Sequence, residues 1–321
     1  MENNAMNANS KTGSSTILEW TEQGRVPDGV VRAGIRRLCR QRLRDIEARD
    51  IEASARRLED FVRMMDRGPV APVPERANEQ HYEVPPEFFQ HALGAHRKYS
   101  CCHWDDDTTN LDEAEAAALR ITCERAGIRD GMDVLELGCG WGSLSLWLAR
   151  HFPGCRITAV SNSAPQREFI MACAAADGLE NLAVITADMN DFDAPAQYDR
   201  IVSLEMFEHM RNYRTLFGRV HDWLKPGGRL FLADVVVQRE LSLEARSNPE
   251  LWAACIAGAL VESELPQVAV QAGLVDGRVV RRFNCFYDTT AEAKVAKDLF
   301  IQSVNFVARK AYDKPMRRQR F

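Results

Sequence analysis

The sequence predicts an α/β fold in which a mostly parallel β-sheet is covered by helices on both faces. Five short apolar or β-branched segments, at residues 132–137, 156–160, 182–186, 200–205 and 228–234, are separated by stretches of helix length. Such alternation is typical of parallel strands joined by crossover helices. Glycines directly after the first segment, and polar residues after later ones, indicate a doubly wound domain with a ligand at its strand ends.

The region before residue 71 is expected to lie outside the sheet. Residues 1–15 are rich in Asn and Ser and predict a disordered tail. Residues 16–70 carry charges of both signs, with apolar residues at helical separations, which predicts two helices with a solvated face. A membrane-surface or partner helix is the alternative. The prolines of RGPVAPVPE end any helix, so we place the start of the main domain at residue 71.

Two later segments, at residues 277–283 and 302–310, are suited to complete the sheet at one edge. They bring the predicted number of strands to seven. The main domain is therefore expected to span residues 71–310, followed by a basic tail at residues 311–321.

Charge and cysteine content narrow the class of partner. The 321 residues are 45% apolar, enough to bury a full core, and their formal net charge is −5. No broad basic field results, so a small molecule is expected as partner rather than nucleic acid. Nine cysteines without a close-spaced metal pattern indicate reduced thiols, no metal site and a cytoplasmic protein. No apolar run predicts a membrane span or a signal peptide, and the oligomeric state stays open, a homodimer being compatible.

The segment VLELGCGWGSLSLWLA joins the first strand to a helix through Gly138, Gly140 and Gly142. Glycines allow a tight turn and a close approach of the backbone to a ligand. The spacing GxGxG, with Glu136 two residues earlier, differs from the GxGxxG of dinucleotide-binding proteins. It resembles the first motif of Rossmann-like S-adenosylmethionine methyltransferases, in which the acid faces the amino acid end of the cofactor. Dinucleotide binding and a purely structural turn are the alternatives.

Polar residues also follow the second and third strands. By the same resemblance, Asp188 is expected to hydrogen-bond the adenine amino group, with Met189 beside it in the cofactor site. A helix cap is the alternative role of Asp188. Many of these methyltransferases have an acid after the second strand, where this chain has Asn162 and Gln166. Both amides donate and accept hydrogen bonds, so we assign them the ribose contact.

A closer resemblance rests on several motifs in order. NEQHYEVPPEFFQHALGAHRKYSCCHW precedes the glycine turn, N-S-x-x-Q follows the second strand and E-M-F-E-H-M follows the fourth. Over about residues 20–231 the chain resembles the coclaurine N-methyltransferase group, itself similar to cyclopropane fatty acid synthases. The resemblance implies a class I methyltransferase fold with S-adenosylmethionine as cofactor. Tyr99 and Ser100 would reach its methionine moiety, and Tyr82 would line the substrate side or else belong to the core.

The segment LEMFEHMRNY holds the candidate catalytic residues Glu205, Glu208 and His209. An alkylamine is largely protonated at neutral pH, and a carboxylate beside an imidazole can take its proton and hold the nascent cation. If the segment is helical, positions i, i+3 and i+4 share one face. The resemblance assigns Glu208 and His209 as the base pair and Glu205 as the amine or cofactor contact. Acids that only complement a helix dipole are the alternative, which accounts poorly for His209.

Beyond GGRLFLADVV the chain departs from the amine methyltransferase pattern. Residues 246–274 and 289–310 resemble the tail of arsenite methyltransferases, with Cys255 in CIAGAL at the position of a metalloid-binding cysteine. A soft thiolate suits As(III), although a buried helix cysteine is the simpler interpretation.

The sequence therefore favours S-adenosylmethionine-dependent N-methylation of a small amine. Methylation of arsenite or a thiol, and cyclopropanation or methylation of an unsaturated acyl chain, are the enzymatic alternatives. A cofactor-binding protein without turnover is the alternative from another class.

Overall fold

A computed structural model describes residues 20, 25–46, 63, 66–72, 86–100, 102–238, 258–284 and 301–312. The chain forms two compact units, Met1–Asp60 and Phe61–Phe321. In the first, helix α2 (Asp28–Ile46) lies within the segment predicted to be helical. Val70 and Ala71, next to the domain boundary expected at residue 71, belong to the hydrophobic core of the second unit. The tail expected at residues 1–15 lies outside the described residues.

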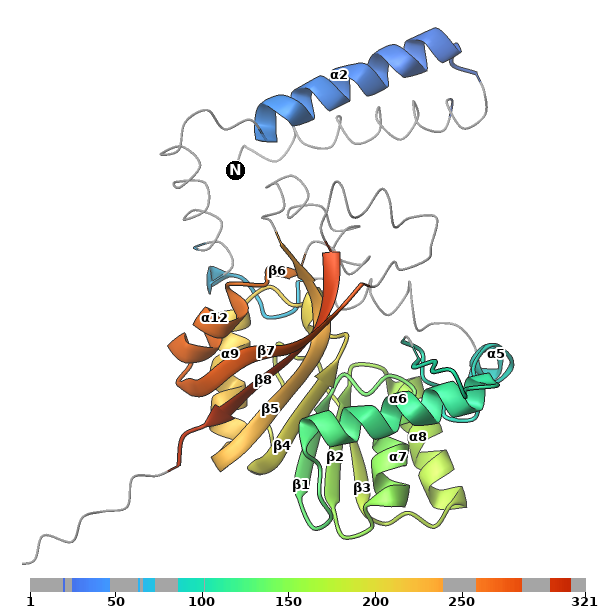
Figure 1. The fold of residues 1–321 in the computed structure, drawn as a ribbon, viewed down its shortest axis with the longest axis vertical. Helices are drawn as coiled ribbons and strands as arrows, with labels where there is room; N and C mark the ends of the chain where they lie inside the picture. The colour runs from blue at the N-terminus through green and yellow to red at the C-terminus, as the bar shows by residue number, and fades with distance from the viewer. Residues whose placement is uncertain are drawn as a thin grey trace, which may run out of the picture. The chain divides into compact units, whose positions relative to one another are not determined.

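The second unit is built on one twisted sheet with strand order β3-β2-β1-β4-β5-β8-β7, and β6 pairs with β5 (Figure 1). The parallel strands are β1 (Asp133–Leu137), β2 (Arg156–Ser161), β3 (Leu182–Thr186), β4 (Tyr198–Leu204), β5 (Leu224–Val237) and the short β6 (Leu260–Val261). Strands β7 (Leu274–Phe283) and β8 (Ile301–Lys310) run antiparallel at one edge. The five predicted strands and both later candidates are confirmed. The sheet has eight strands rather than seven because it includes β6. This strand has two residues and is too short to show a sequence pattern.

Helices cover both faces of this sheet. One hydrophobic cluster joins alternate strand residues to α6 (Leu111–Ala126), α7 (Ser143–His151) and α8 (Ala164–Ala176). A second cluster joins the opposite strand face to α9 (Tyr213–Trp223) and α12 (Leu265–Gln271). The alternation is visible in β1, where Val134 packs in the first cluster and Leu135 in the second. The doubly wound α/β class is thus confirmed.

Local sequence sets where the helices begin. Asn110 accepts a hydrogen bond from the Glu113 N–H at 3.0 Å and starts α6, which ends at Gly127 in the left-handed conformation. Ser163 caps α8 in the same way, with Pro165 in its first turn. None of the helices in the described part of the chain combines the length and apolar character needed to cross a bilayer.

Strands β1 and β4 are neighbours in the sheet. From β1 the chain continues to β2 and β3 on one side, and from β4 it continues to β5 on the other side, so the strand order reverses between β1 and β4. In doubly wound sheets a crevice opens at this reversal, beyond the carboxyl ends of the strands. The loops after β1, β2, β3 and β4 all reach this end of the sheet, and they carry the candidate residues.

Candidate active site

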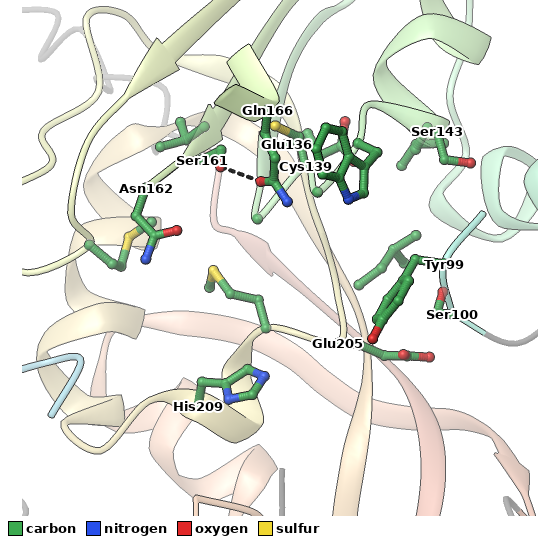
Figure 2. Close-up of a pocket in the computed structure, with 18 of the residues that line it drawn as sticks. Tyr99, Ser100, Glu136, Cys139, Ser143, Ser161, Asn162, Gln166, Glu205 and His209 are labelled. Atoms are coloured by element: carbon green, nitrogen blue, oxygen red, sulfur yellow. Dashed lines mark hydrogen bonds between the residues drawn. The ribbon is translucent and has the colours of Figure 1, made fainter. Parts of the chain in front are cut away.

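A cavity of about 270 Å³ lies beyond the carboxyl ends of these strands. Figure 2 shows Glu136, Ser161 and Gln166 on one side of it and Glu205 and His209 on the other. The candidate residues that line it are Tyr99, Ser100, Glu136, Gly138, Gly140, Asn162, Gln166, Asp188, Met189, Glu205, Glu208 and His209. One cavity therefore brings together the residues assigned to the cofactor and those assigned to proton transfer.

Gly140 and Gly142, in the turn after β1, are required for different reasons. Gly140 has φ of +52° and lines the cavity, and a Cβ added to it would meet no atom of the described residues within 4 Å. Gly142, at φ +80°, precedes α7 and is absent from the cavity lining, and a Cβ there would lie 2.6 Å from Ile170 Cγ1. Gly140 thus leaves open space for a ligand, whereas Gly142 permits close packing of α7 on α8.

Glu136 is buried on the floor of the cavity with 3% of its surface exposed. Ser145, which is also buried, donates a hydrogen bond to its carboxyl group. Burial raises the pKa of Glu136 to about 8, against the smaller opposing effect of this hydrogen bond. The carboxyl is therefore largely neutral at pH 7 until a cation comes near it.

This pKa predicts a pH dependence of folding stability. An unfolded Glu136 ionises near pH 4.5 and the folded one near pH 8, so the folded state binds more protons between these values. The free energy of unfolding should fall as the pH rises from about 4.5 to 8, at about 1.4 kcal/mol per pH unit at most. Urea unfolding of wild type and Glu136→Gln at pH 5 and pH 8.5 tests this. Equal falls in both proteins would show that Glu136 is not the cause.

The loop after β2 is held by a buried hydrogen bond, drawn in Figure 2, in which Ser161 Oγ and Gln166 Oε1 are 2.6 Å apart. The Gln166 Nε2 group is buried and has no hydrogen-bond partner among the residues that the structure describes. Asn162 lines the cavity beside them and is exposed. The Gln166 amide is thus oriented by the protein through its oxygen and has its N–H groups available to a ligand.

Asp188 stands at the turn after β3. Its Oδ1 accepts a hydrogen bond from the Asn190 N–H at 2.8 Å within this turn, and no helix begins here among the described residues, so the helix cap considered as an alternative is not formed. Met189 is buried beside it. Both line the cavity, and the assignment of Asp188 to an adenine amino group remains a prediction.

The segment that carries Tyr99 and Ser100 is anchored by a residue that sequence reasoning missed. Glu115 on α6 has no exposed surface and accepts three backbone N–H bonds, from Gly94 at 2.9 Å, His96 at 2.8 Å and Lys98 at 3.1 Å. In Figure 2 the hydroxyl of Tyr99 points toward Glu205. Glu115 thus holds the chain that brings Tyr99 and Ser100 to the cavity.

Glu115→Gln should loosen this segment, because a glutamine side chain has one acceptor oxygen and an NH₂ group that opposes the backbone donors. Affinity for the cofactor proposed below should fall roughly tenfold, as expected from a lost hydrogen bond to a charged group. Titration calorimetry measures it. Glu113→Gln on the same helix is the control, since the Glu113 side chain is exposed and accepts hydrogen bonds from the N–H and hydroxyl groups of Thr109. Equal affinities in both variants would show that the segment does not contribute.

The segment after β4 differs from the predicted helix. Glu205 has φ of +53°, in the left-handed region, and only Phe207–His209 form a short 3₁₀-helix, labelled η1. The predicted helical i, i+3, i+4 face is therefore wrong. Glu205 and His209 nevertheless line the same cavity as Glu208, because the left-handed turn redirects the chain. A non-glycine residue in the left-handed conformation destabilises the folded state by about 1–2 kcal/mol. Residues with such strained backbones cluster at functional sites.

Two more groups were missed. Ser143 Oγ and Trp141 Nε1 are buried, and within the described part of the chain they have no hydrogen-bond partner. Both residues line the cavity. Ser143 begins α7, where serine is ordinary as a helix-starting residue. The sequence therefore carried no signal that distinguished a ligand contact from a cap.

The chain matches the family model of mycolic acid cyclopropane synthetase over residues 73–258. The chain belongs to this family. A relative within the reach of sequence comparison, (S)-coclaurine N-methyltransferase of Thalictrum flavum subsp. glaucum, is 38% identical over 68% of this chain and 61% of its own length. The chain thus spans about three fifths of the curated relative it matches. The resemblance to coclaurine N-methyltransferases and cyclopropane synthases is confirmed.

The solved structures agree with this family. Coclaurine N-methyltransferase bound to N-methylheliamine and SAH superposes with a TM-score of 0.66 at 27% identity, covering 92% of this chain and 99% of that one. An arsenic(III) methyltransferase from Chlamydomonas reinhardtii has a TM-score of 0.51 at 21% identity, covering 76% of this chain and 75% of that one. The second likeness shows a shared fold alone, so the arsenite resemblance of the C-terminal part has no further support.

Tyr82 and Cys255 are the two candidate substrate residues, and both lie outside the residues that the structure describes. Their roles in this mycolic acid cyclopropane synthetase family member remain predictions.

Proposed function

We propose that this protein is an S-adenosylmethionine-dependent methyltransferase that methylates the nitrogen of a small amine. The observation that carries the proposal is the single cavity in which the glycine turn after β1 faces Glu205, Glu208 and His209. The 38% identical relative named as an N-methyltransferase supports the amine as acceptor.

The cavity suits S-adenosylmethionine by its own chemistry. The open space at Gly140 accommodates a ligand close to the backbone, and Ser143, Trp141 and Gln166 present buried polar groups that have no hydrogen-bond partner in the described ranges of the chain. Such groups are costly to bury unless a ligand completes their hydrogen bonds. We assign Gln166 and Asn162 to the ribose, Asp188 and Met189 to the adenine, and Glu136, Tyr99 and Ser100 to the amino acid end. The cofactor would supply an electrophilic methyl group on a sulfonium.

Glu136 would then be the counter-charge of the cofactor ammonium. A cation beside a buried carboxyl lowers its pKa, so the neutral Glu136 of the ligand-free protein would ionise on binding and release a proton. The raised pKa in the ligand-free protein is consistent with a site built to receive a cation.

At the opposite wall, Glu208 and His209 would take the proton of the bound ammonium and free the nitrogen lone pair for attack. Glu205, held in its unusual backbone conformation, would contact the amine or the cofactor. A carboxylate facing the acceptor also stabilises the positive charge that the nitrogen gains as the methyl group arrives. These residues thus favour an amine as the methyl acceptor.

A labelled-methyl assay with the purified chain tests the proposal. Secondary amines, arsenite, thiols and unsaturated phospholipid vesicles are offered in parallel with labelled S-adenosylmethionine. We expect label in the amine. Label in the phospholipid alone would establish the lipid alternative, and cofactor binding without transfer to any acceptor would indicate a binding protein.

A further inference from the structure

Glu208 is backed by a second carboxyl group, that of Asp234 on β5. Each side chain has only 2% of its surface exposed, and the two are joined by a side-chain hydrogen bond. Glu208 lines the cavity, whereas Asp234 lies behind it and is absent from the lining among the described residues. The arrangement places one acid at the cavity wall and a second one layer deeper.

Asp234 also fixes the turn that carries the candidate base. Its Oδ2 accepts a hydrogen bond from the Phe207 N–H at 2.8 Å, and its Oδ1 accepts from the N–H groups of Glu208 at 3.1 Å and Val235 at 2.8 Å. Three backbone donors favour the ionised form of Asp234. An ionised carboxylate only accepts hydrogen bonds, so the bond between the two acids requires a proton on one of them, and the backbone donors at Asp234 favour its place on Glu208.

We propose that Glu208 and Asp234 share one proton at rest, and that Glu208 passes a second proton from the cavity to Asp234 during turnover. The inference rests on the proposed amine methylation. A proton from the substrate ammonium reaches the carboxyl group of Glu208, while the proton that Glu208 already holds moves along the hydrogen bond to Asp234. The amine nitrogen keeps its lone pair, and the pair of acids changes from one negative charge to none.

The surroundings agree with a pair that can take up this second proton. Burial raises the pKa of Asp234 above its ordinary value, and hydrogen bonds from Glu208 and the backbone oppose the rise. Among the described residues, the other titratable groups around the pair are His209 and Glu205 in the cavity and Tyr213 on α9, whose hydroxyl donates to the carbonyl groups of Phe207 and Gly258. Tyr213 is thus engaged with the backbone, and Asp234 is a positioning residue that acts through Glu208.

Infrared difference spectroscopy of the ligand-free protein at pH 7 tests the resting state without any turnover. The carbonyl stretch of a neutral carboxylic acid should disappear in Glu208→Gln. It should also disappear in Asp234→Asn, although Glu208 is still present, because the asparagine amide donates to Glu208 and leaves it ionised. Glu136→Gln identifies the separate neutral acid at that position.

Glu115→Gln is the matched control, since Glu115 is likewise buried and accepts three backbone N–H bonds. It should leave the Glu208 signal unchanged. A signal that persists in Asp234→Asn would mean that burial alone keeps Glu208 neutral, and one that persists in Glu208→Gln would mean that Glu208 carries no proton. Either result overturns the inference. If Asp234→Asn does not fold, the Glu208→Gln spectrum still decides whether the pair of acids holds a proton.

Kinetics then test the transfer step. Asp234→Asn should lower kcat by about tenfold or more while the cofactor Kd stays within a few-fold, and the pH profile of kcat should change shape because the pair no longer titrates as a unit. An unchanged profile in a folded variant overturns the transfer step. Failure to methylate any amine would refute the proposed function, while the infrared result would still decide how the two acids share their proton.

Discussion

Replacing His209 with alanine should lower kcat for an accepted amine by about 100-fold or more, the usual scale of a general-base contribution. The cofactor Kd should stay within a few-fold, because His209 lies across the cavity from Glu136 and Gln166 (Figure 2). Raising the pH toward the pKa of the amine should partly restore the rate, since neutral amine then forms in solution without the base. A pH–rate profile of both proteins measures the loss and its recovery.

His221→Ala is the control for the loss of an imidazole. His221 lies on α9, contacts Asp222 at 3.0 Å and is absent from the cavity lining. It should leave the pH–rate profile unchanged. A His209→Ala protein with near wild-type kcat at neutral pH and only a lower Tm would mean that His209 stabilises the turn and that its assignment as a base is wrong.

The strands could be predicted because each has a short-range pattern that its environment does not alter. The segments at 132–137 and 182–186 consist largely of apolar residues between turn signals, and a sheet with both faces covered is the structure that buries such segments. Strands β7 and β8 were also predicted from their sequence patterns. Their antiparallel direction was not predicted, because the length of a connecting segment does not specify the direction of the strand that follows it.

The positions of the site residues at the ends of these strands could be predicted from the fold, but their backbone conformation could not. The left-handed conformation of Glu205 depends on its surroundings, including a hydrogen bond from its N–H to the Ala233 carbonyl oxygen at 2.8 Å. No propensity of glutamate favours it. A helical pattern was therefore expected where the chain makes a turn and a short 3₁₀-helix.

The acids that organise the site were the hardest to recognise. Asp234 appears in GRLFLAD as the polar end of a strand, yet β5 continues to Val237 and buries it. Glu115 appears in LDEAEAAALR as one more charge on a helix surface, yet three backbone groups distant in sequence converge on it. Their roles come from tertiary contacts, which leave no periodic signal in the sequence.

Replacing Gly140 with alanine should weaken cofactor binding by roughly 10- to 100-fold. The added Cβ would meet no protein atom within 4 Å, so it would project into the space assigned to the cofactor. Overpacking of a filled site costs about 1–3 kcal/mol, and each 1.4 kcal/mol corresponds to a tenfold change in Kd. Titration calorimetry with S-adenosylmethionine measures the affinity.

The backbone strain of this substitution has to be separated from the loss of space. Gly178, in the turn after α8, has φ of +66° compared with +52° for Gly140, and a Cβ added there also meets nothing within 4 Å. It is absent from the cavity lining. Gly178→Ala should therefore lower the Tm by a similar amount and leave the cofactor Kd unchanged, because both variants place an L-residue in the left-handed region. If Gly140→Ala binds the cofactor as tightly as Gly178→Ala does, the glycine turn does not face the cofactor, and the cavity must hold it in another orientation.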